Sequence, residues 1–448
     1  MPQERSALVR VGSFTLLIAI LFAGAAMAAA STEFVLYPFP RGTPNKTTGC
    51  NPEGQLIADA AGNFYGTTSS CGAFGAGTVF ELVRPATGSS KWTETVLYNF
   101  AGSSDGALPQ AGLTFDAAGN LYGTTNRGGA SQEGVVFEVS PPAAGESAWT
   151  ESVLYSFQGG TADGAYPQYQ GVVFDHAGNL YGVTPLGGMD YSEDKHCGTN
   201  GCGVIYELTP PATPGNPWTE TILHYFNGGQ GSEGAGTPIF DAKGNLYGEA
   251  IGGGESGGGL VYRLSPPPAG ETAWTFKVLY AFAGGTSNDA RYPQGSLTFH
   301  GSGVLYGTAL GGQYGVGTVF QLTPPTVTGG AWTETVLYNF SSGSDGAYPL
   351  AETLIFDKAG NIYGTTANGG GNGSSQCTYG GCGTVFELSP PVAGSSGWTE
   401  TILHSFPTVV KDAASPISGV IFGKNGNLYG VTPSGGSGGL GTVYTVAP

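Results

Sequence analysis

The sequence predicts an all-β fold, a seven-bladed β-propeller with four strands in each blade. Three observations lead to this prediction. One sequence unit recurs seven times after about the first thirty residues. Each of the first six units holds four short strand-like runs, which is the strand number of a propeller blade. The last unit lacks its fourth run, and a single matching run stands before the first unit.

Composition supports a fold made of short strands. Of the 448 residues, 80 are Gly, 12% are aromatic and only 10% are charged. A disordered low-complexity chain is also rich in Gly, but it is poor in aromatic residues. Many aromatics together with many glycines instead favour short strands joined by tight turns.

Two phrases mark the repeat. The phrase Trp-Thr-Glu-Thr-Val-Leu-Tyr-Asn-Phe fills residues 92–100 and again 332–340, and related copies start at Trp149, Trp218, Trp274 and Trp398. The phrase Gly-Asn-x-Tyr-Gly starts at Gly62, Gly119, Gly178, Gly244, Gly360 and Gly426, and an imperfect copy starts at Gly303. A fixed unit of this kind is the signature of a repeat architecture.

The second unit shows how the runs divide. We expect strands over 112–116, 121–125, 134–139 and 149–157. The link Asp116-Ala-Ala-Gly-Asn has turn chemistry, because Asp bonds the backbone ahead of it and Gly accepts a positive φ. We expect the repeated Tyr of the second run to lie in the core between blades.

The two ends of the chain predict how the ring closes. Residues 33–37, Glu-Phe-Val-Leu-Tyr, match the start of the fourth run. The chain ends at Pro448, just after the third run of the seventh unit. We therefore expect the N-terminal strand to pair with the last blade as its outer strand. Closure of this kind removes exposed strand edges, whereas an open solenoid would need caps.

The first thirty residues resemble a signal peptide. Arg5 and Arg10 precede an apolar stretch from Phe14 to Ala23, and small residues follow. We assign 1–30 to the signal peptide and 31–448 to one propeller domain. We expect a secreted, extracellular protein, with the periplasm as the alternative, and a monomer.

Charge excludes two classes of partner. Acidic residues outnumber basic ones 32 to 15, so the formal net charge is −17, and no Lys/Arg cluster interrupts the acidic balance. Nucleic acids and anionic membrane surfaces both require a basic footprint. We therefore expect neither as a partner.

The six cysteines fit an oxidising compartment. They fall as Cys50 with Cys71, Cys197 with Cys202 and Cys377 with Cys382. Export favours three disulfides over a zinc site, because the two Cys-x4-Cys pairs lie far apart in the sequence.

The units resemble the GloVer tandem repeat of secreted bacterial proteins. The motifs that carry this resemblance include Leu97-Tyr98-Asn99-Phe100, residues 120–125 (Asn-Leu-Tyr-Gly-Thr-Thr) and residues 383–388 (Gly-Thr-Val-Phe-Glu-Leu). The resemblance spans essentially the whole chain after residue 30. It implies an exported protein and supplies no catalytic residues. Family members often carry a C-terminal anchoring signal, and its absence here favours free secretion.

Five aspartates are the candidate ligand-binding residues. If the first run of each unit is innermost, the links from fourth to first run and from second to third run share one face. That face would carry Asp105, Asp163, Asp289, Asp345 and Asp412. Two interpretations stay open: a turn role, or a ring of carboxylates around the channel mouth that takes a polar ligand or Ca²⁺. We expect no other cofactor and no other metal.

Function is less constrained by the sequence than fold. We expect a binding module for a polysaccharide or a protein at the loop-rich face. A carbohydrate-active hydrolase or lyase that uses channel carboxylates is the first alternative, and a surface scaffold is the second. We predict no catalytic residues, because departures from the repeat are dispersed. His224 and His404 replace the Tyr of the fourth run and are interpreted as structural.

Overall fold

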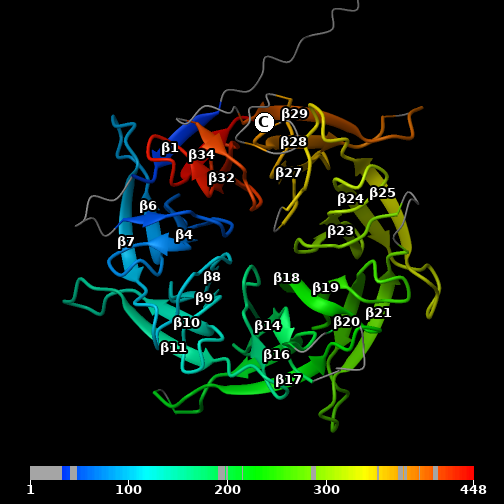
Figure 1. The fold of residues 1–448 in the computed structure, drawn as a ribbon, viewed down its shortest axis with the longest axis horizontal. Helices are drawn as coiled ribbons and strands as arrows, with labels where there is room; N and C mark the ends of the chain where they lie inside the picture. Colours follow the sequence, from blue (N-terminus) through cyan, green and yellow to red (C-terminus); the bar gives the residue numbers. More distant parts are fainter. Residues whose placement is uncertain are drawn as a thin grey trace, which may run out of the picture.

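The strands form seven four-stranded antiparallel sheets arranged in a ring (Figure 1). The structure is a computed structural model, and it describes residues 33–40, 48–189, 197, 200–213, 215–283, 289–350, 353–371, 377, 381–392, 394–406 and 412–448. No α-helix occurs within these ranges, and so none of the described segments is a helix long and apolar enough to cross a bilayer. The predicted seven-bladed propeller is confirmed. The predicted signal peptide lies outside the described residues.

Each blade contributes one strand to each of four concentric positions. The innermost strands are β3 (Ile57–Ala58), β8 (Thr114–Phe115), β13 (Val173–Phe174), β18 (Ser232–Phe240), β22 (Thr298–His300), β26 (Ile355–Phe356) and β31 (Ile421–Phe422). The second strands are β4 (Phe64–Thr68), β9 (Leu121–Thr125), β14 (Leu180–Thr184), β19 (Leu246–Gly252), β23 (Val304–Ala309), β27 (Ile362–Thr366) and β32 (Leu428–Thr432).

The two outer positions hold the third and fourth strands of each blade. The third strands are β6 (Thr78–Val83), β10 (Val135–Ser140), β16 (Val204–Thr209), β20 (Leu260–Ser265), β24 (Thr318–Thr323), β28 (Thr384–Ser389) and β34 (Thr442–Val446). The outermost are β7 (Thr93–Asn99), β11 (Thr150–Ser156), β17 (Thr219–Tyr225), β21 (Thr275–Ala281), β25 (Thr333–Asn339), β29 (Thr399–Ser405) and β1 (Phe34–Pro38).

The N-terminal strand closes the ring as predicted. β1 pairs with β34 in the seventh blade, with Phe34 opposite Thr445 and Val35 opposite Tyr444. The register shifts between Val35 and Tyr37. A shift at the matching place interrupts the other outer pairs, such as β10 with β11. β1 therefore repeats even the bulge of an outer strand.

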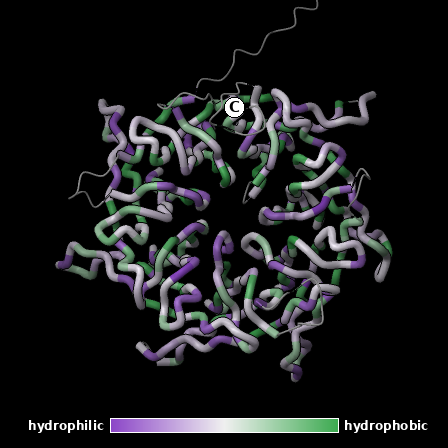
Figure 2. The backbone as a smooth tube through the Cα atoms, viewed as in Figure 1, coloured by the Kyte–Doolittle hydropathy of each residue, from purple (hydrophilic) through white to green (hydrophobic). Residues whose placement is uncertain are grey.

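The hydrophobic core lies between neighbouring blades. All five residues of β9 are buried, because the blades on both sides cover it. Tyr122 of β9 packs edge-on against Phe174 of the next blade, with ring centroids 4.9 Å apart, which confirms the predicted core role of the repeated Tyr. Figure 2 shows hydrophobic residues within the blades and hydrophilic ones at loop tips around the centre and the periphery.

The turn from first to second strand follows its sequence. Asp116 Oδ1 accepts hydrogen bonds from the backbone N–H groups of Ala118 and Asn120, each 2.9 Å long. Its Oδ2 accepts from the side chains of Asn120 at 2.8 Å and Tyr122 at 3.2 Å. The carboxylate therefore holds the turn and the inter-blade Tyr together, as the motif predicts.

Candidate functional site

One face of the ring carries both kinds of long connection, and we call it the loop face. It holds the links from each outermost strand to the next innermost strand and those from second to third strand. Short ribbons join the two kinds of link within a blade: β2 (Gly49–Cys50) with β5 (Ser70–Cys71), β12 (Gly164–Ala165) with β15 (Leu186–Gly187), and β30 (Ala413–Ala414) with β33 (Ser434–Gly435). The predicted sharing of one face is confirmed.

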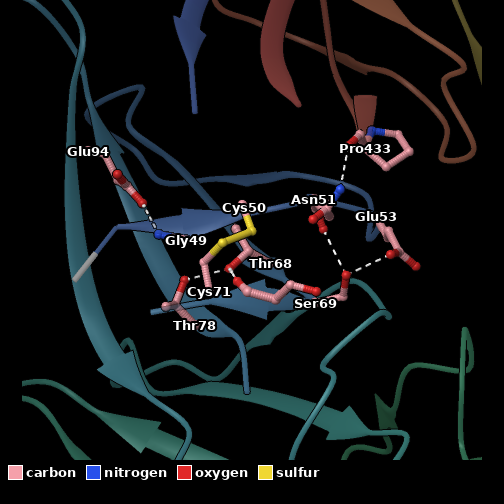
Figure 3. The surroundings of a disulfide bond; sticks show 11 residues. Gly49, Cys50, Asn51, Glu53, Thr68, Ser69, Cys71, Thr78, Glu94 and Pro433 are labelled. Atoms are coloured by element: carbon pink, nitrogen blue, oxygen red, sulfur yellow. Dashed lines mark hydrogen bonds between the residues drawn. A yellow bond between two sulfur atoms is a disulfide. The ribbon is translucent and has the colours of Figure 1, made fainter. Parts of the chain in front are cut away.

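Three disulfides fasten this face. Cys50 in β2 bonds Cys71 in β5, so the two links of the first blade are joined covalently (Figure 3). Next to them, Asn51 Nδ2 donates to Pro433 O of the seventh blade at 2.8 Å. Cys197 bonds Cys202 and Cys377 bonds Cys382. All three predicted pairs form, while most residues between the partners of the last two pairs lie outside the described ranges. Disulfides of this kind are typical of proteins that mature outside the reducing cytosol.

Every blade places a left-handed residue at the same repeat position on the loop face. These seven residues have φ between 55° and 57°, and they are Asn51, Leu108, Tyr166, Glu233, Tyr292, Tyr348 and Ser415. All but Glu233 precede a proline, where steric clash already restricts the backbone. Each N–H bonds a carbonyl of the preceding blade, as from Leu108 to Ala76 O at 2.9 Å and from Tyr348 to Val316 O at 2.6 Å. These inter-blade bonds offset the cost of the left-handed backbone.

The segments after these left-handed residues surround the ring's axis. A cavity of about 270 Å³ opens there, lined by residues from the third to the seventh blade: Gln168, Tyr169, Gln170, Pro185, Glu233, Gly236, Ile251, Gln294, Leu350 and Ile417. We call it the axial cavity. Gln168, Gln294, Leu350 and Ile417 each directly follow a proline. The repeat therefore delivers the residue after this proline to the cavity from four blades, whereas the fourth blade lacks the proline and contributes Glu233 and Gly236.

The first two blades contribute a polar network to the same region. Glu53 accepts hydrogen bonds from Ser69 Oγ at 2.6 Å and from Gln110 Nε2 at 2.7 Å. Asn126 Nδ2 donates to Gln110 Oε1 at 3.0 Å. Glu53 and Gln110 also directly follow a proline. The ring around the axis is thus polar over several blades and apolar at Leu350 and Ile417.

The five predicted aspartates lie elsewhere. Each sits in the first part of its link, beside the outermost strand, and not around the channel mouth. Asp105 Oδ2 accepts from Tyr98 Oη at 3.0 Å and from the Ala101 N–H at 2.7 Å. Because the carboxylate caps the end of the outer strand, it cannot also reach the axis. The expected position of the five aspartates, around the channel mouth, is therefore wrong. The residues concerned are Asp105, Asp163, Asp289, Asp345 and Asp412.

These aspartates take part in a contact between adjacent outer strands. In four copies the Tyr of one outer strand lies between the loop Asp and a Glu of the next blade, and we call these sets the inter-blade acid groups. Tyr155 Oη, for example, bonds Asp163 at 3.0 Å and Glu220 at 2.8 Å. The four groups are Tyr98–Asp105–Glu151, Tyr155–Asp163–Glu220, Tyr280–Asp289–Glu334 and Tyr338–Asp345–Glu400.

Burial raises the pKa of the glutamates in these groups above that of an exposed glutamate. Burial, and then the nearby Asp105 charge, raise the pKa of Glu151 to about 7. Burial raises the pKa of Glu400 to about 8 against the opposing bond from Tyr338. The pKa values of Glu220 and Glu334 are raised mainly by burial as well. Each group therefore favours one retained proton near neutral pH.

Three interfaces depart from this pattern. Between the seventh and first blades, Tyr37 donates to Glu94 at 2.7 Å, and Thr48 stands at the aspartate position. Between the third and fourth blades, His224 stacks on Phe276 with centroids 3.8 Å apart. Between the sixth and seventh blades, His404 Nε2 lies 3.3 Å from Glu33 Oε2. His224 and His404 thus occupy the predicted Tyr positions in two different surroundings.

Two features of the structure are not apparent from the sequence motifs. The glutamates of the inter-blade acid groups were visible only as a letter of the Trp-Thr-Glu-Thr repeat. Their signal was covariation: Phe276 replaces Glu in the blade that follows the one with His224 in place of Tyr. Glu249 of β19 is fully buried, and neither carboxyl oxygen has a hydrogen-bond partner among the described residues. It interrupts a position that is Thr or Val in the other blades, which was the available signal.

The comparisons with known proteins agree with the repeat. A model of the Gloeobacter/Verrucomicrobia repeat matches residues 25–193 and 186–378, so the GloVer-type resemblance is confirmed. No curated protein matches the chain.

Solved structures similar to the chain have low identity. A PQQ-bound aldose sugar dehydrogenase from Streptomyces coelicolor is 16% identical, with a TM-score of 0.43, over 80% of this chain and 98% of that one. A gluconolactonase from Xanthomonas campestris is 13% identical, with a TM-score of 0.38, over 74% and 85%. A Trypanosoma rangeli sialidase bound to sialic acid is 12% identical, with a TM-score of 0.39, over 94% and 59%. Likeness at this level does not extend to substrate or reaction.

Proposed function

The chain belongs to the Gloeobacter/Verrucomicrobia repeat family, and we propose that it is an extracellular binding module whose ligand is a neutral glycan. The proposed site is the axial cavity on the loop face. The observation that carries the proposal is the mixed lining of that cavity.

The lining offers what a sugar requires. Gln168, Gln294 and Glu233 supply amide and carboxylate groups that hydrogen-bond hydroxyls. Tyr169, which is 38% exposed, and the apolar Leu350 and Ile417 supply surfaces for the faces of sugar rings. Most ligand sites combine an apolar lining with a few placed polar groups. The cavity, about 270 Å³, is slightly smaller than the usual ligand pocket, so it suits a short stretch of a glycan.

Hydrogen bonds to the backbone hold the lining of the site in place. Gln170, only 5% exposed, donates from Nε2 to Gly234 O at 3.2 Å and accepts from the Tyr169 N–H at 3.1 Å. The bonded left-handed residues fix the start of each segment. A preorganised site loses less conformational entropy when it binds.

Charge selects among glycans. The net charge of −17 and the exposed Glu233 in the lining disfavour acidic polysaccharides. The probes are therefore cello-, xylo-, malto- and chito-oligosaccharides, with alginate oligosaccharides as the acidic comparison. Calorimetric titration should detect one neutral series and no alginate binding.

Variants locate the site. Gln168→Ala combined with Gln294→Ala should weaken binding of that series at least about tenfold, since each lost hydrogen bond contributes about 1 kcal/mol. Val327→Ser, in the exposed connection between β24 and β25 on the opposite face, is the control and should leave binding unchanged. Equal binding by the double variant and the control would exclude the axial cavity.

Two outcomes would replace the proposal. Release of new reducing ends from a bound probe, abolished in Glu233→Gln without loss of binding, would make the protein an enzyme. No binding to any probe would favour the scaffold alternative, whose partner is another protein.

Export is part of the same proposal. The three disulfides and the absence of a membrane-spanning helix among the described residues are compatible with it. Fractionation of expressing cells should place the disulfide-bonded protein in the medium or the periplasm. Recovery of the reduced protein from the cytosol would contradict export.

A further inference from the structure

The interface between the sixth and seventh blades brings three metal-ligating side chains together. They are Glu33, directly before β1, His404 in β29, and Asp412, directly before β30. One ligand atom of each lies within 4.8 Å of the other two, and no other such set of three occurs among the described residues. The three come from opposite ends of the chain and meet because β1 closes the ring.

This set is an altered inter-blade acid group. Asp412 and Glu33 stand where the other groups have their Asp and Glu, while His404 replaces the Tyr. A neutral imidazole is the commonest metal ligand in proteins. The replacement therefore converts a phenol between two carboxyls into a nitrogen and two carboxyl oxygens, a set suited to divalent transition metals.

A second observation points to a bound cation. The Glu33 side chain is only 2% exposed, and its Oε1 has no hydrogen-bond partner among the described residues. A carboxyl oxygen of Glu33 lies within 4.8 Å of one of Asp412. Two acceptors that face each other in a buried site are satisfied only when a proton or a cation lies between them.

We propose that Glu33, His404 and Asp412 bind a divalent transition-metal ion of the Zn²⁺ type. The ion joins the N-terminal strand to the sixth blade and thereby stabilises the closed ring. Ca²⁺ is disfavoured, because it prefers six to eight oxygen ligands. The inference is independent of the glycan proposal, since this site lies beside the outer strands and not at the axial cavity.

The test compares metal binding before and after the repeat pattern is restored. The disulfide-bonded protein, treated with EDTA and dialysed, is titrated with Zn²⁺, Co²⁺ and Ca²⁺. We expect one equivalent of Zn²⁺ to bind and to raise the melting temperature with concentration. We also expect that bound Co²⁺ shows an absorption spectrum typical of a site with a nitrogen ligand. Ca²⁺ should leave the melting temperature unchanged.

His404→Tyr is the main variant, because it recreates the Tyr–Asp–Glu set of four other interfaces and should fold. It should bind Zn²⁺ at least about 100-fold more weakly, in line with loss of one of three protein ligands. Glu33→Gln should weaken binding similarly and serves if His404→Tyr does not fold. His224→Tyr, at the interface without carboxyls, is the matched control and should bind Zn²⁺ as the wild type does.

Two results would overturn the proposal. One is wild-type protein that binds no Zn²⁺ or Co²⁺, which would mean that a proton bridges the two carboxyls. The other is undiminished Zn²⁺ binding by His404→Tyr or, if that variant does not fold, by Glu33→Gln.

Discussion

Tyr338 of the fifth blade donates a 3.0 Å hydrogen bond to Glu400 Oε2 of the sixth. The same phenol lies 3.3 Å from Asp345 Oδ2. One phenol hydrogen cannot serve two carboxylates, so the group is satisfied best when one carboxyl keeps its proton. The outer strands of adjacent blades are therefore joined by a contact that depends on pH.

Stability should fall as the pH rises from about 5 to 9. The folded pKa of Glu400 is about 8, raised mainly by burial, whereas an unfolded Glu titrates near pH 4.3. Between these pH values the folded state therefore binds more protons than the unfolded state. The stability that protonated Glu400 contributes is fully present below about pH 4.3 and is lost as the pH rises through about 8. Urea unfolding at pH 5, 7 and 9 measures the slope.

Glu400→Gln should reduce that slope and stabilise the protein at pH 9 by about 1 kcal/mol, because the amide imitates the protonated carboxyl. Glu146→Gln, on an exposed connection, is the control. A slope unchanged by Glu400→Gln would refute the shared-proton interpretation.

Protonation of His224 should lower the stability of the protein as the pH falls. Burial lowers the pKa of His224 to about 4, so the unfolded state binds its proton first. The stability contributed by the neutral ring is present above about pH 6.5 and is lost as the pH falls towards 4. His224→Phe should keep the stacking on Phe276 and remove this loss. His176→Gln, at an exposed site, should not, and equal acid lability of both variants would contradict the assignment.

The disulfides should differ in their contribution to stability. Cys50–Cys71 spans 21 residues of sequence and Cys377–Cys382 spans 5. The entropy of loop closure predicts a loss of about 3 kcal/mol for Cys50→Ser with Cys71→Ser and about 2 kcal/mol for the second pair. Urea unfolding of both double variants measures the difference. A larger loss for the second pair would show that it does more than close a loop.

Replacing Glu249 should stabilise the fold. Its buried carboxyl lacks hydrogen-bond partners among the described residues, and burial raises its pKa well above the usual value. Val183 and Val431 occupy the same repeat position without a polar group. Glu249→Val should therefore raise the unfolding free energy by about 1–2 kcal/mol, as repeat-consensus substitutions commonly do.

Thr124→Val is the comparison for Glu249→Val. Thr124 Oγ1 donates to Gln170 O at 2.8 Å, so valine at this position should destabilise the protein by about 1 kcal/mol. Destabilisation in both variants would show that the Glu249 carboxyl has a partner after all.

The architecture was accessible from the sequence because it rests on local, repeated chemistry. The second strand of the second blade covers Leu121–Thr125, as its motif predicts, and Asp116 forms the predicted turn. The matching of residues 33–37 to an outer strand predicted closure, and the pairing of β1 with β34 confirms it. The cysteine pairs followed from compartment and spacing.

The positions of the candidate sites were decided by tertiary structure. The five aspartates occupy one repeat position that says nothing of radial position. Bonds to the end of the outer strand keep Asp105, Asp163, Asp289 and Asp345 from the axis, and Asp412 lies beside Glu33 and His404. Four of the side chains that line the axial cavity lie one residue past a proline, and they are Gln in two blades, Leu in one and Ile in one. No chemical type is therefore repeated strictly enough to mark the cavity in the sequence.

By itself, the sequence determined seven units, four strands in each, the closing strand and the disulfide partners, because each depends on residues that lie near in sequence or repeat. Only the folded ring decided that Glu33 meets His404 and Asp412. It also decided that the outer-strand Tyr of each inter-blade acid group reaches a Glu of the next blade. Contacts between blades depend on how twisted sheets pack around an axis, and a repeat read along the chain does not contain that geometry.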